Sequence, residues 1–391
     1  MKGKKENTEI LDGFFMMFRY YGIYPKRGAA INDIKFHVQF MIIIFLYSNA
    51  TVGGAMLLFQ MFYRKEHILI KDLLDNLVVL AAGIGMHTVI LVFRKTMPLM
   101  QKIIRKISHT GDRFGVPDDM WKRNKQMELF GYASFFYTFF GAISYTLVGI
   151  LDIDSCKQQK IEYNLSKVCG MMQLTWMPFD IESFPNYQIF WVLQFVTCTA
   201  IASLTLVISV FLFSINEMFM TRIAHWRDKF NVTFNLKDEE EQRAHLNLCI
   251  EYHFEIIELY QQINLYLSPL ILTLLLMGSP IISIISFTFM LKHELKSVFH
   301  VFGWITSTFL ICYCGQRLID ESEKMTMEVY SCKWYNAKLT FQKDIYLMIL
   351  RMQKLMVLNA YGFFDVSLAQ FCSMMQNSYS FLALLNQTYK E

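Results

Sequence analysis

Long apolar runs separated by short charged segments dominate the chain. A helix that crosses the hydrocarbon layer of a bilayer needs about 20 consecutive, mostly apolar residues. Seven stretches reach or approach this length, and they hold no Asp, Glu, Lys or Arg except Asp365 in the last. The predicted spans are 38–62, 76–93, 129–151, 187–216, 261–291, 297–316 and 355–388. This pattern predicts an all-α membrane protein, folded over residues 1–391 as one seven-transmembrane helical bundle.

Lys and Arg are unevenly distributed between the spans. The segment before the first span and the segments between spans 2–3, 4–5 and 6–7 hold 28 of the 37. Because cytoplasmic loops are enriched in Lys and Arg, we expect a cytosolic N-terminus and, after seven spans, an extracellular C-terminus. G-protein-coupled receptors have the opposite orientation, so the distribution argues against that class. Residues 1–12 are polar and charged, and we expect no cleavable signal peptide.

Two of the predicted cytosolic segments, 217–262 and 317–354, carry apolar residues at helical spacing. These residues are Leu246, Ile250, Phe254 and Ile257 in the first segment, and Tyr330, Trp334, Ala337, Phe341, Ile345 and Met348 in the second. Apolar stripes below a membrane need partners. We therefore expect spans 4–7 to continue into the cytosol and to pack there as an intracellular helical anchor, a natural site for subunit assembly.

The loop 152–186 is long and lies on the predicted outer side. It contains a glycosylation sequon at Asn164. Such triplets also occur by chance, and another at 231–233 falls in a predicted cytosolic segment. Cys156 and Cys169 share the loop and could pair in an oxidising space. Prolines and aromatic residues at 176–185 suggest an ordered lid rather than a slack linker.

Composition and motifs exclude several functions. Charged residues make up 18% of the chain, against about 25% in soluble domains. The net charge of +4 is small and scattered, so no nucleic-acid-binding surface is indicated. Cys312 and Cys314 lie within an apolar run, which favours helix packing over a metal site. No catalytic motif is present, and we expect neither an enzyme nor a bound cofactor.

Polar and aromatic residues inside the spans are the candidates for a ligand site, because burying polar groups in a membrane is unfavourable unless they are satisfied or functional. The candidates are His87 in the second span, Tyr137, Gly141, Ser144 and Tyr145 in the third, Trp191, Phe195 and Thr199 in the fourth, and Phe302 and Thr306 in the sixth. The alternatives are helix–helix bonds for His87 and the third span, and aromatic residues at the membrane interface for Trp191.

Asp365 is the acid inside the last predicted span. At 1.5 Å per residue it lies about 15 Å from the start of that helix. A carboxylate there must be paired or hydrated. It could face a cation pathway, or it could pair with a Lys or Arg of the anchor.

The C-terminal third resembles insect odorant receptors. The matching motifs are 314–322 (CGQRLIDES) at the end of the sixth span, Trp334-Tyr335, 351–354 (RMQK) with Ser367-Leu368 and Phe371, 378–385 (SYSFLALL) near the C-terminus, and 177–180 (MPFD) in the outer loop. Two departures occur. Leu355-Met356 stands where many members have Pro, and Phe381-Leu382-Ala383 replaces the common Tyr-Phe-Thr. The first 150 residues match by span pattern only.

This resemblance implies a subunit of a ligand-gated, non-selective cation channel in the plasma membrane of sensory neuron dendrites. It implies a tetramer with the odorant-receptor coreceptor, an odorant pocket in the outer half of spans 2, 3, 4 and 6, and a pore lined by the last helix. Leu384, Gln387 and Thr388 then lie at the narrow part of the pore. The short segment between spans 4 and 5 indicates an odorant-tuning subunit rather than the coreceptor. A metabotropic receptor, a gustatory-receptor-like homomer and a transporter are the alternatives.

Overall fold

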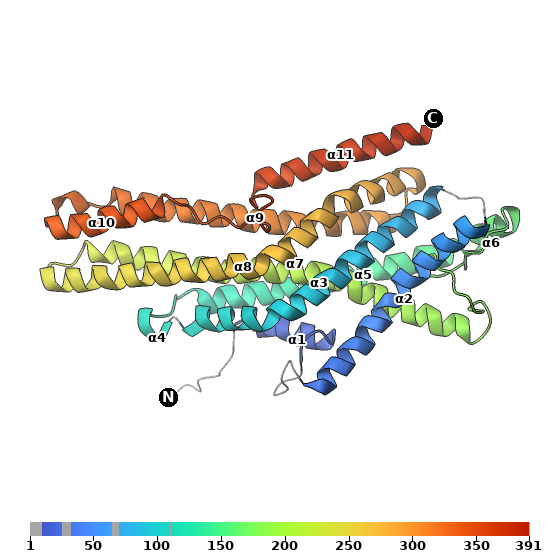
Figure 1. Cartoon of the computed structure of the whole chain (residues 1–391), viewed down its shortest axis with the longest axis horizontal. Helices are drawn as coiled ribbons and strands as arrows, with labels where there is room; N and C mark the ends of the chain where they lie inside the picture. Colours follow the sequence, from blue (N-terminus) through green and yellow to red (C-terminus); the bar gives the residue numbers. More distant parts are fainter. Residues whose placement is uncertain (1–9, 26–32, 65–69, 110, 391) are drawn as a thin grey trace.

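The computed structural model describes residues 10–25, 33–64, 70–109 and 111–390, and these are almost entirely helical (Figure 1). Residues 1–9, most of the polar start discussed above, lie outside the described residues. The long helices are α2 (Ile34–Arg64), α3 (Ile70–His109), α5 (Met120–Leu151), α7 (Asn186–Thr233), α8 (Glu239–Lys292) and α9 (Leu295–Ser331). The shorter helices are α1 (Asp12–Tyr20), α4 (Gly111–Phe114), α6 (Ile153–Glu162), η1 (Trp334–Asn336), α10 (Leu339–Met352) and α11 (Leu368–Lys390).

Within the described residues, six helices are long and apolar enough to cross a membrane, namely α2, α3, α5, α7, α8 and α9. They contain the first six predicted spans. The seventh predicted span overlaps α11, which has 23 residues, or about 35 Å of helix. The fold is therefore an all-α transmembrane bundle, as the apolar pattern predicts.

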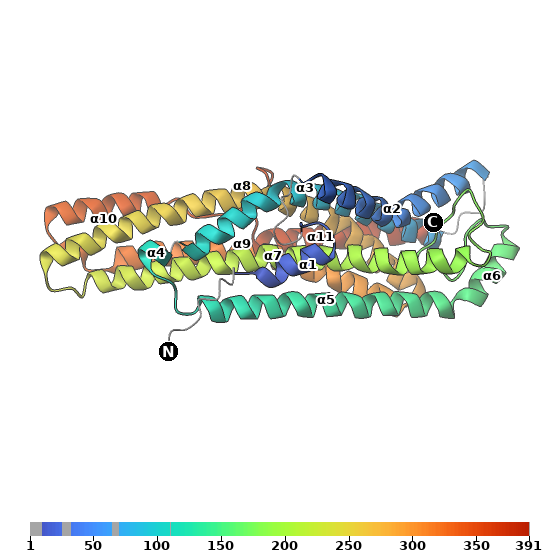
Figure 2. The same ribbon diagram turned by 90° about the horizontal axis from the view of Figure 1, so that it is seen from below.

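The long helices lie side by side in an elongated molecule (Figures 1 and 2). α10 lies at one end, beside the final turns of α9, and α6 lies at the other. α11 follows the outside of the bundle, where it packs on α8 and α9. We use the name distal bundle for the end that holds residues 217–233, 239–262, 317–331 and 339–352, the region predicted as the anchor.

The distal bundle has an aromatic core. The rings of Trp226 and Phe230 stack with centroids 5.0 Å apart, and the indole N–H of Trp226 donates to the carbonyl oxygen of Cys249 at 2.8 Å. Phe341 of α10 packs edge-on against Phe234, the residue that follows α7. The polar rim includes an ion pair between Lys338 and Glu239, 2.5 Å long. Four helical segments thus cover one another's apolar faces, as the stripe pattern requires.

The predicted apolar stripes are only partly buried. Leu246, Phe341 and Ile345 are buried, but Phe254 is 63% exposed and Tyr330 is 65% exposed. Steps of four residues rotate by about 400°, so Phe254 lies about 80° around the helix from Leu246. The inclusion of Phe254 and Tyr330 in the packed stripes is therefore wrong.

The predicted seventh span, 355–388, is wrong in its first third. Residues 353–367 leave the helical conformation, Asn359 and Asp365 form an isolated antiparallel bridge, and α11 begins at Leu368. Asp365 does not lie inside a helix. It is exposed, and its carboxylate accepts a hydrogen bond of 3.1 Å from the Asn359 side chain.

Polar side chains of α8 hold this non-helical segment, which we call the hinge segment (residues 353–367). Asn264 accepts the backbone N–H of Asn359 at 2.8 Å, and Ser268 donates to the carbonyl of Asn359 at 2.7 Å. Non-helical backbone at membrane depth is tolerated only where protein groups or water satisfy it. Hydropathy alone cannot detect such side-chain bonds, and it therefore extended the helix too far.

Gly315 of α9 allows the hinge segment to approach closely. A Cβ at this position would overlap the carbonyl oxygen of Val366. The backbone N–H of Val366 in turn donates to the carbonyl of Leu358 at 2.8 Å. The glycine inside the CGQRL motif therefore has a steric function.

α1 packs into the bundle between α5 and α7 (Figure 2). Phe14 and Phe18 are fully buried, and both rings contact Phe211 of α7. The backbone N–H of Leu11 donates to the Asn124 side chain of α5 at 2.7 Å. Hydropathy could not predict this element, because a nine-residue helix is too short to span.

Candidate ligand-binding cavity

A cavity of about 280 Å³ lies among α3, α5, α7 and α9 and beneath residues 167–174. Its lining includes the apolar residues Val78, Met86, Ile201, Ile285 and Phe299. Small-molecule sites typically measure about 300–1,000 Å³ and combine apolar walls with a few polar groups. The cavity lies near the lower limit of that range and fits a small ligand.

Hydrogen bonds between α5 and α9 order one wall of the cavity. The Tyr145 hydroxyl lies 2.7 Å from Nδ1 of His300, and the Trp304 indole N–H donates to Nε2 of the same imidazole at 3.2 Å. An indole nitrogen can only donate, so Nε2 of a neutral His300 is the acceptor and the imidazole proton is on Nδ1. The Nδ1–H group then donates a hydrogen bond to the hydroxyl oxygen of Tyr145. Tyr137 donates to the carbonyl of Phe299 at 2.7 Å.

Neutral polar groups of α2, α3 and the loop before α7 also line the cavity, together with the charged Asp72, Asp75 and Lys167. Gln173 is 8% exposed; its side chain donates to the carbonyl of Ala50 at 2.9 Å, and its backbone N–H donates to Gln194 at 3.3 Å. Asn76 of α3 is 1% exposed, and neither its Oδ1 nor its Nδ2 has a hydrogen-bond partner among the described residues. The cavity is thus apolar with polar groups on two sides.

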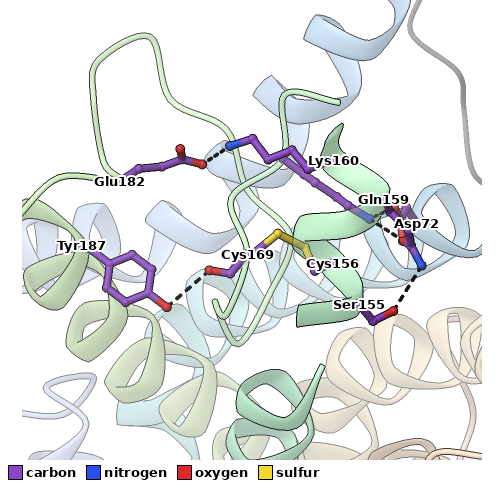
Figure 3. The surroundings of a disulfide bond; sticks show 9 residues. Asp72, Ser155, Cys156, Gln159, Lys160, Cys169, Glu182 and Tyr187 are labelled. Carbon is purple, nitrogen blue, oxygen red and sulfur yellow. Dashed lines mark hydrogen bonds and ion pairs between the residues drawn. A yellow bond between two sulfur atoms is a disulfide. The ribbon is translucent and has the colours of Figure 1, made fainter. Parts of the chain in front are cut away.

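Part of residues 152–186, which we call the lid segment, lines the cavity. Figure 3 shows the surroundings of its disulfide bond. Cys156 of α6 and Cys169 form a disulfide. Lys167 pairs with Asp72 of α3 at 2.7 Å, with each side chain 7% exposed, and it also donates to Gln159 at 3.2 Å. The disulfide therefore joins residue 169 of the lid segment to α6, and the buried ion pair joins residue 167 to α3.

The MPFD motif shapes the entry into α7. The carboxylate of Asp180 accepts the backbone N–H groups of Glu182 at 2.9 Å and Ser183 at 3.3 Å. Hydrogen bonds from Ser183 and from the Glu182 backbone lower the pKa of Asp180. Asn186, the first residue of α7, donates to the carbonyl of Asp180 at 2.8 Å. In the same lid segment, Asn164 is exposed in the left-handed conformation, with φ of 50°.

The structure brings some of the predicted ligand residues to the cavity. Tyr137, Gly141 and Tyr145 line it. Ser144 is next to them in sequence, but its hydroxyl bonds the carbonyl of Gly141 within α5 at 2.6 Å. His87 lies outside the lining and bridges α2 and α3, with Nε2 3.0 Å from the Ser48 hydroxyl.

The remaining predicted ligand residues lie outside the lining. Trp191 and Phe195 stack on each other with centroids 5.9 Å apart, and Thr199 donates to the carbonyl of Phe195 at 2.6 Å. Phe302 is 59% exposed and Thr306 is partly buried. Helical spacing puts the candidates of each helix on one face of that helix. Which direction that face points in the bundle is set by packing against the neighbouring helices.

Asn76, Gln173 and His300 were not predicted as lining residues. His300 could have been predicted by the same criterion as His87, because each is a histidine in a predicted span without Asp, Glu, Lys or Arg. Asn76 stands at the first position of a predicted span, where a polar residue is unremarkable. Gln173 lies in a loop, and no sequence pattern reveals that its amide reaches Ala50. Among the described residues, no cluster of His, Cys, Asp or Glu could hold a metal ion.

The predicted pore residues lie on α11. Leu384, Gln387 and Thr388 are exposed, and the Thr388 hydroxyl donates to the carbonyl of Leu384 at 3.0 Å. α11 is joined to α8 by Ser378, whose hydroxyl lies 3.0 Å from that of Ser279. This leaves the outer face of α11, with Leu384, uncovered in the single chain.

A membrane-spanning helical bundle with a cavity of small-molecule size between its helices is the architecture of a multi-pass membrane receptor. The sequence profile described as 7tm Odorant receptor matches residues 69–379, and the chain belongs to that family. It is 31% identical over 148 residues to putative odorant receptor 85d and 29% identical over 147 residues to odorant receptor 85b, both of Drosophila melanogaster. These matches cover 37% and 36% of this chain, but only 36% and 37% of the relatives.

Solved structures of an insect olfactory receptor share the fold over nearly the whole chain. OR5 from Machilis hrabei in complex with eugenol superposes with a TM-score of 0.78 at 14% identity, covering 96% of this chain and 97% of that one. A second OR5 structure gives a TM-score of 0.70 at 15% identity, with the same coverage. At this identity the likeness establishes the fold.

Proposed function

We propose that this chain is the odorant-binding, tuning subunit of a heteromeric ligand-gated cation channel. The observation that carries the proposal is the cavity of about 280 Å³ between the helices of a chain of the odorant receptor family. OR5 was solved with eugenol, a small volatile phenol, which supports a ligand of that size here. The turn between α7 and α8 is short, from Thr233 to Glu239. The coreceptor is expected to have a much longer segment there.

α8 supplies a mechanical connection from the cavity to the proposed pore helix. Ile285 and Thr288 of α8 line the cavity. On the same helix, two residues before Ile285, the Ser283 hydroxyl donates to the carbonyl of Ser378 in α11 at 2.9 Å. A ligand shifts a gating equilibrium only through its different affinity for the two states. We infer that ligand binding favours an α8 position in which α11 moves outward.

The pore in this proposal forms where α11 meets the corresponding helices of the other three subunits. Leu384, Gln387 and Thr388 surround its narrow part, and Asp365, at the base of α11, lies in a vestibule where a carboxylate attracts cations. Apolar rings gate by dewetting. A threonine at 388 therefore gives this subunit a weaker barrier than an apolar side chain would.

The distal bundle supplies the proposed contact with the coreceptor. Its exposed apolar side chains include Tyr330, Leu339, Tyr346 and Leu347, each more than half exposed. A group of such residues is typical of a protein–protein interface. In this arrangement the N-terminus and the distal bundle are cytosolic, the lid segment is extracellular, and the protein lies in the plasma membrane of sensory dendrites.

The test is whole-cell current during exposure to a panel of small volatiles, with and without the coreceptor and with G-protein signalling blocked. We expect a fast cation current that needs both subunits and survives the block. A current without the coreceptor would support a gustatory-type homomer instead. Loss of the response under the block would support a metabotropic receptor.

A further inference from the structure

Asn76 lines the cavity and has a buried carboxamide without a hydrogen-bond partner among the described residues. The side chain is 1% exposed, and both of its polar atoms are without a partner among the described residues. Buried polar groups in proteins are nearly always hydrogen-bonded. An exception at the wall of a ligand cavity points to a bond that forms with the ligand.

The neighbouring side chains do not complete the bonding of Asn76. A Cβ on Gly54 would lie 3.2 Å from Oδ1 of Asn76 and 3.1 Å from Nε2 of Gln173, so both amides face the same small residue of α2. The Gln173 amide nitrogen is already bonded to Ala50. Thr51 of α2 also lines the cavity, and its hydroxyl likewise has no partner within the described part of the chain.

Five charged residues line the cavity. Asp152 is exposed at the end of α5, and the other four take part in interactions within the protein. Lys167 pairs with Asp72 at 2.7 Å, and Lys296 pairs with Glu294 at 2.9 Å. Asp75, next to Asn76 on α3, also takes part in an interaction within the protein. The groups left for a ligand on this wall are therefore neutral hydrogen-bonding groups.

We propose that Asn76 determines specificity for a hydroxyl-bearing ligand, an alcohol or a phenol with a mostly apolar body. A hydroxyl is both donor and acceptor, so it can donate to Oδ1 of Asn76 and accept from Nδ2. An ether or a carbonyl can engage only Nδ2, and a hydrocarbon engages neither atom. A site built for a hydroxyl discriminates strongly against the analogue that lacks it. The inference rests on the proposed function, because it takes this cavity as the odorant site.

The ligand-side test uses wild-type receptor with the coreceptor. Whole-cell currents are compared for primary alcohols and phenols of about six to ten carbon atoms, the size such a cavity admits, and for their methyl ethers, primary amines and parent hydrocarbons. We expect the hydroxyl compounds to act at concentrations roughly tenfold lower than their ethers.

The outcomes separate this inference from the proposed function. Currents with equal potency for alcohols and ethers would overturn the assignment to Asn76 and leave the channel function standing. Stronger responses to the amines would assign recognition to the Asp75 carboxylate, and this result would also overturn the assignment to Asn76. Absence of current with every compound would reject the proposed function and the inference with it.

The protein-side test changes Asn76 and a matched asparagine. Asn76→Leu should raise the half-maximal concentration of alcohols about tenfold more than that of the ethers and leave that of the parent hydrocarbons unchanged, so the preference disappears. Asn76→Gln keeps the amide and should retain the preference. Asn49→Leu is the control, because Asn49 lies outside the lining of the cavity and bonds Thr197 at 3.0 Å.

Surface labelling accompanies each variant. A wild-type alcohol preference in Asn76→Leu at normal surface expression would overturn the proposal. If Asn76→Leu does not reach the surface, the wild-type ligand series decides, since it needs no variant to fold.

Discussion

The hydroxyl of Tyr260 in α8 forms two hydrogen bonds with the backbone of Val357: it donates to the carbonyl at 2.8 Å and accepts the N–H at 3.1 Å. One side chain thus replaces two backbone hydrogen bonds that a helix would have made at this position. Asn264 and Ser268, one and two turns further along α8, continue the same function. The point at which α11 can begin is therefore set by α8.

Removing this contact should destabilise the hinge segment. Tyr260→Phe leaves the carbonyl and N–H of Val357 without partners, which costs roughly 1–3 kcal/mol. We expect a lower midpoint of thermal unfolding for the detergent-solubilised receptor. Tyr266→Phe, at the next tyrosine of α8, is the matched control. Equal midpoints for the two variants would contradict the stabilising function of Tyr260.

A methyl group at Gly315 should displace the hinge segment. Gly315→Ala places a Cβ against the carbonyl oxygen of Val366, and backbone cannot give way as a flexible side chain can. Overpacking of this kind costs roughly 1–3 kcal/mol, so surface expression and melting temperature should fall. Gly303→Ala on the same helix is the control, because its Cβ would lie 3.7 Å from Tyr137, an ordinary contact distance. Similar losses in both variants would count against the steric explanation.

The buried ion pair of the lid segment should be more important than the exposed one. Lys167→Met leaves the Asp72 carboxylate buried without its partner, which destabilises by about 3–5 kcal/mol. Lys160→Met breaks a pair with Glu182 whose side chains are 31% and 50% exposed, and such pairs contribute about 0–1 kcal/mol. Melting temperatures of the two variants test the difference. The double variant Lys167→Met/Asp72→Leu should recover most of the loss; failure to recover would mean that Lys167 stabilises the lid by other contacts.

The proposed pore predicts an effect of the Thr388 side chain on leak current. Thr388→Leu adds an apolar group at the narrow part and should strengthen the dewetting barrier. We expect lower basal current from the channel formed with the coreceptor, while Thr388→Ser leaves it near wild type. Basal current and ion selectivity are recorded at matched surface expression. If both are unchanged in Thr388→Leu, position 388 does not lie at the barrier.

Bilayer thickness imposes a length on each apolar run, and this is why the helices α2, α3, α5, α7, α8 and α9 could be predicted from the sequence. The same criterion wrongly predicts a helix over residues 355–367. Residues there are apolar enough for a helix, but Tyr260, Asn264 and Ser268 offer the backbone other partners. The motifs of the C-terminal third indicate the family correctly, and one of them contains Gly315, whose function becomes clear only beside Val366.

By itself the sequence determined the membrane-spanning all-α class and the family, because these depend on local composition, span length and short motifs. Only the tertiary structure decided which faces of the helices meet. Helix rotation is set by packing of many side chains together, so it placed Tyr137, Gly141 and Tyr145 at the cavity and Trp191, Phe195 and Phe302 outside it. The same packing buried Asn76 and His300 at the cavity wall, which no periodicity of a single helix reveals.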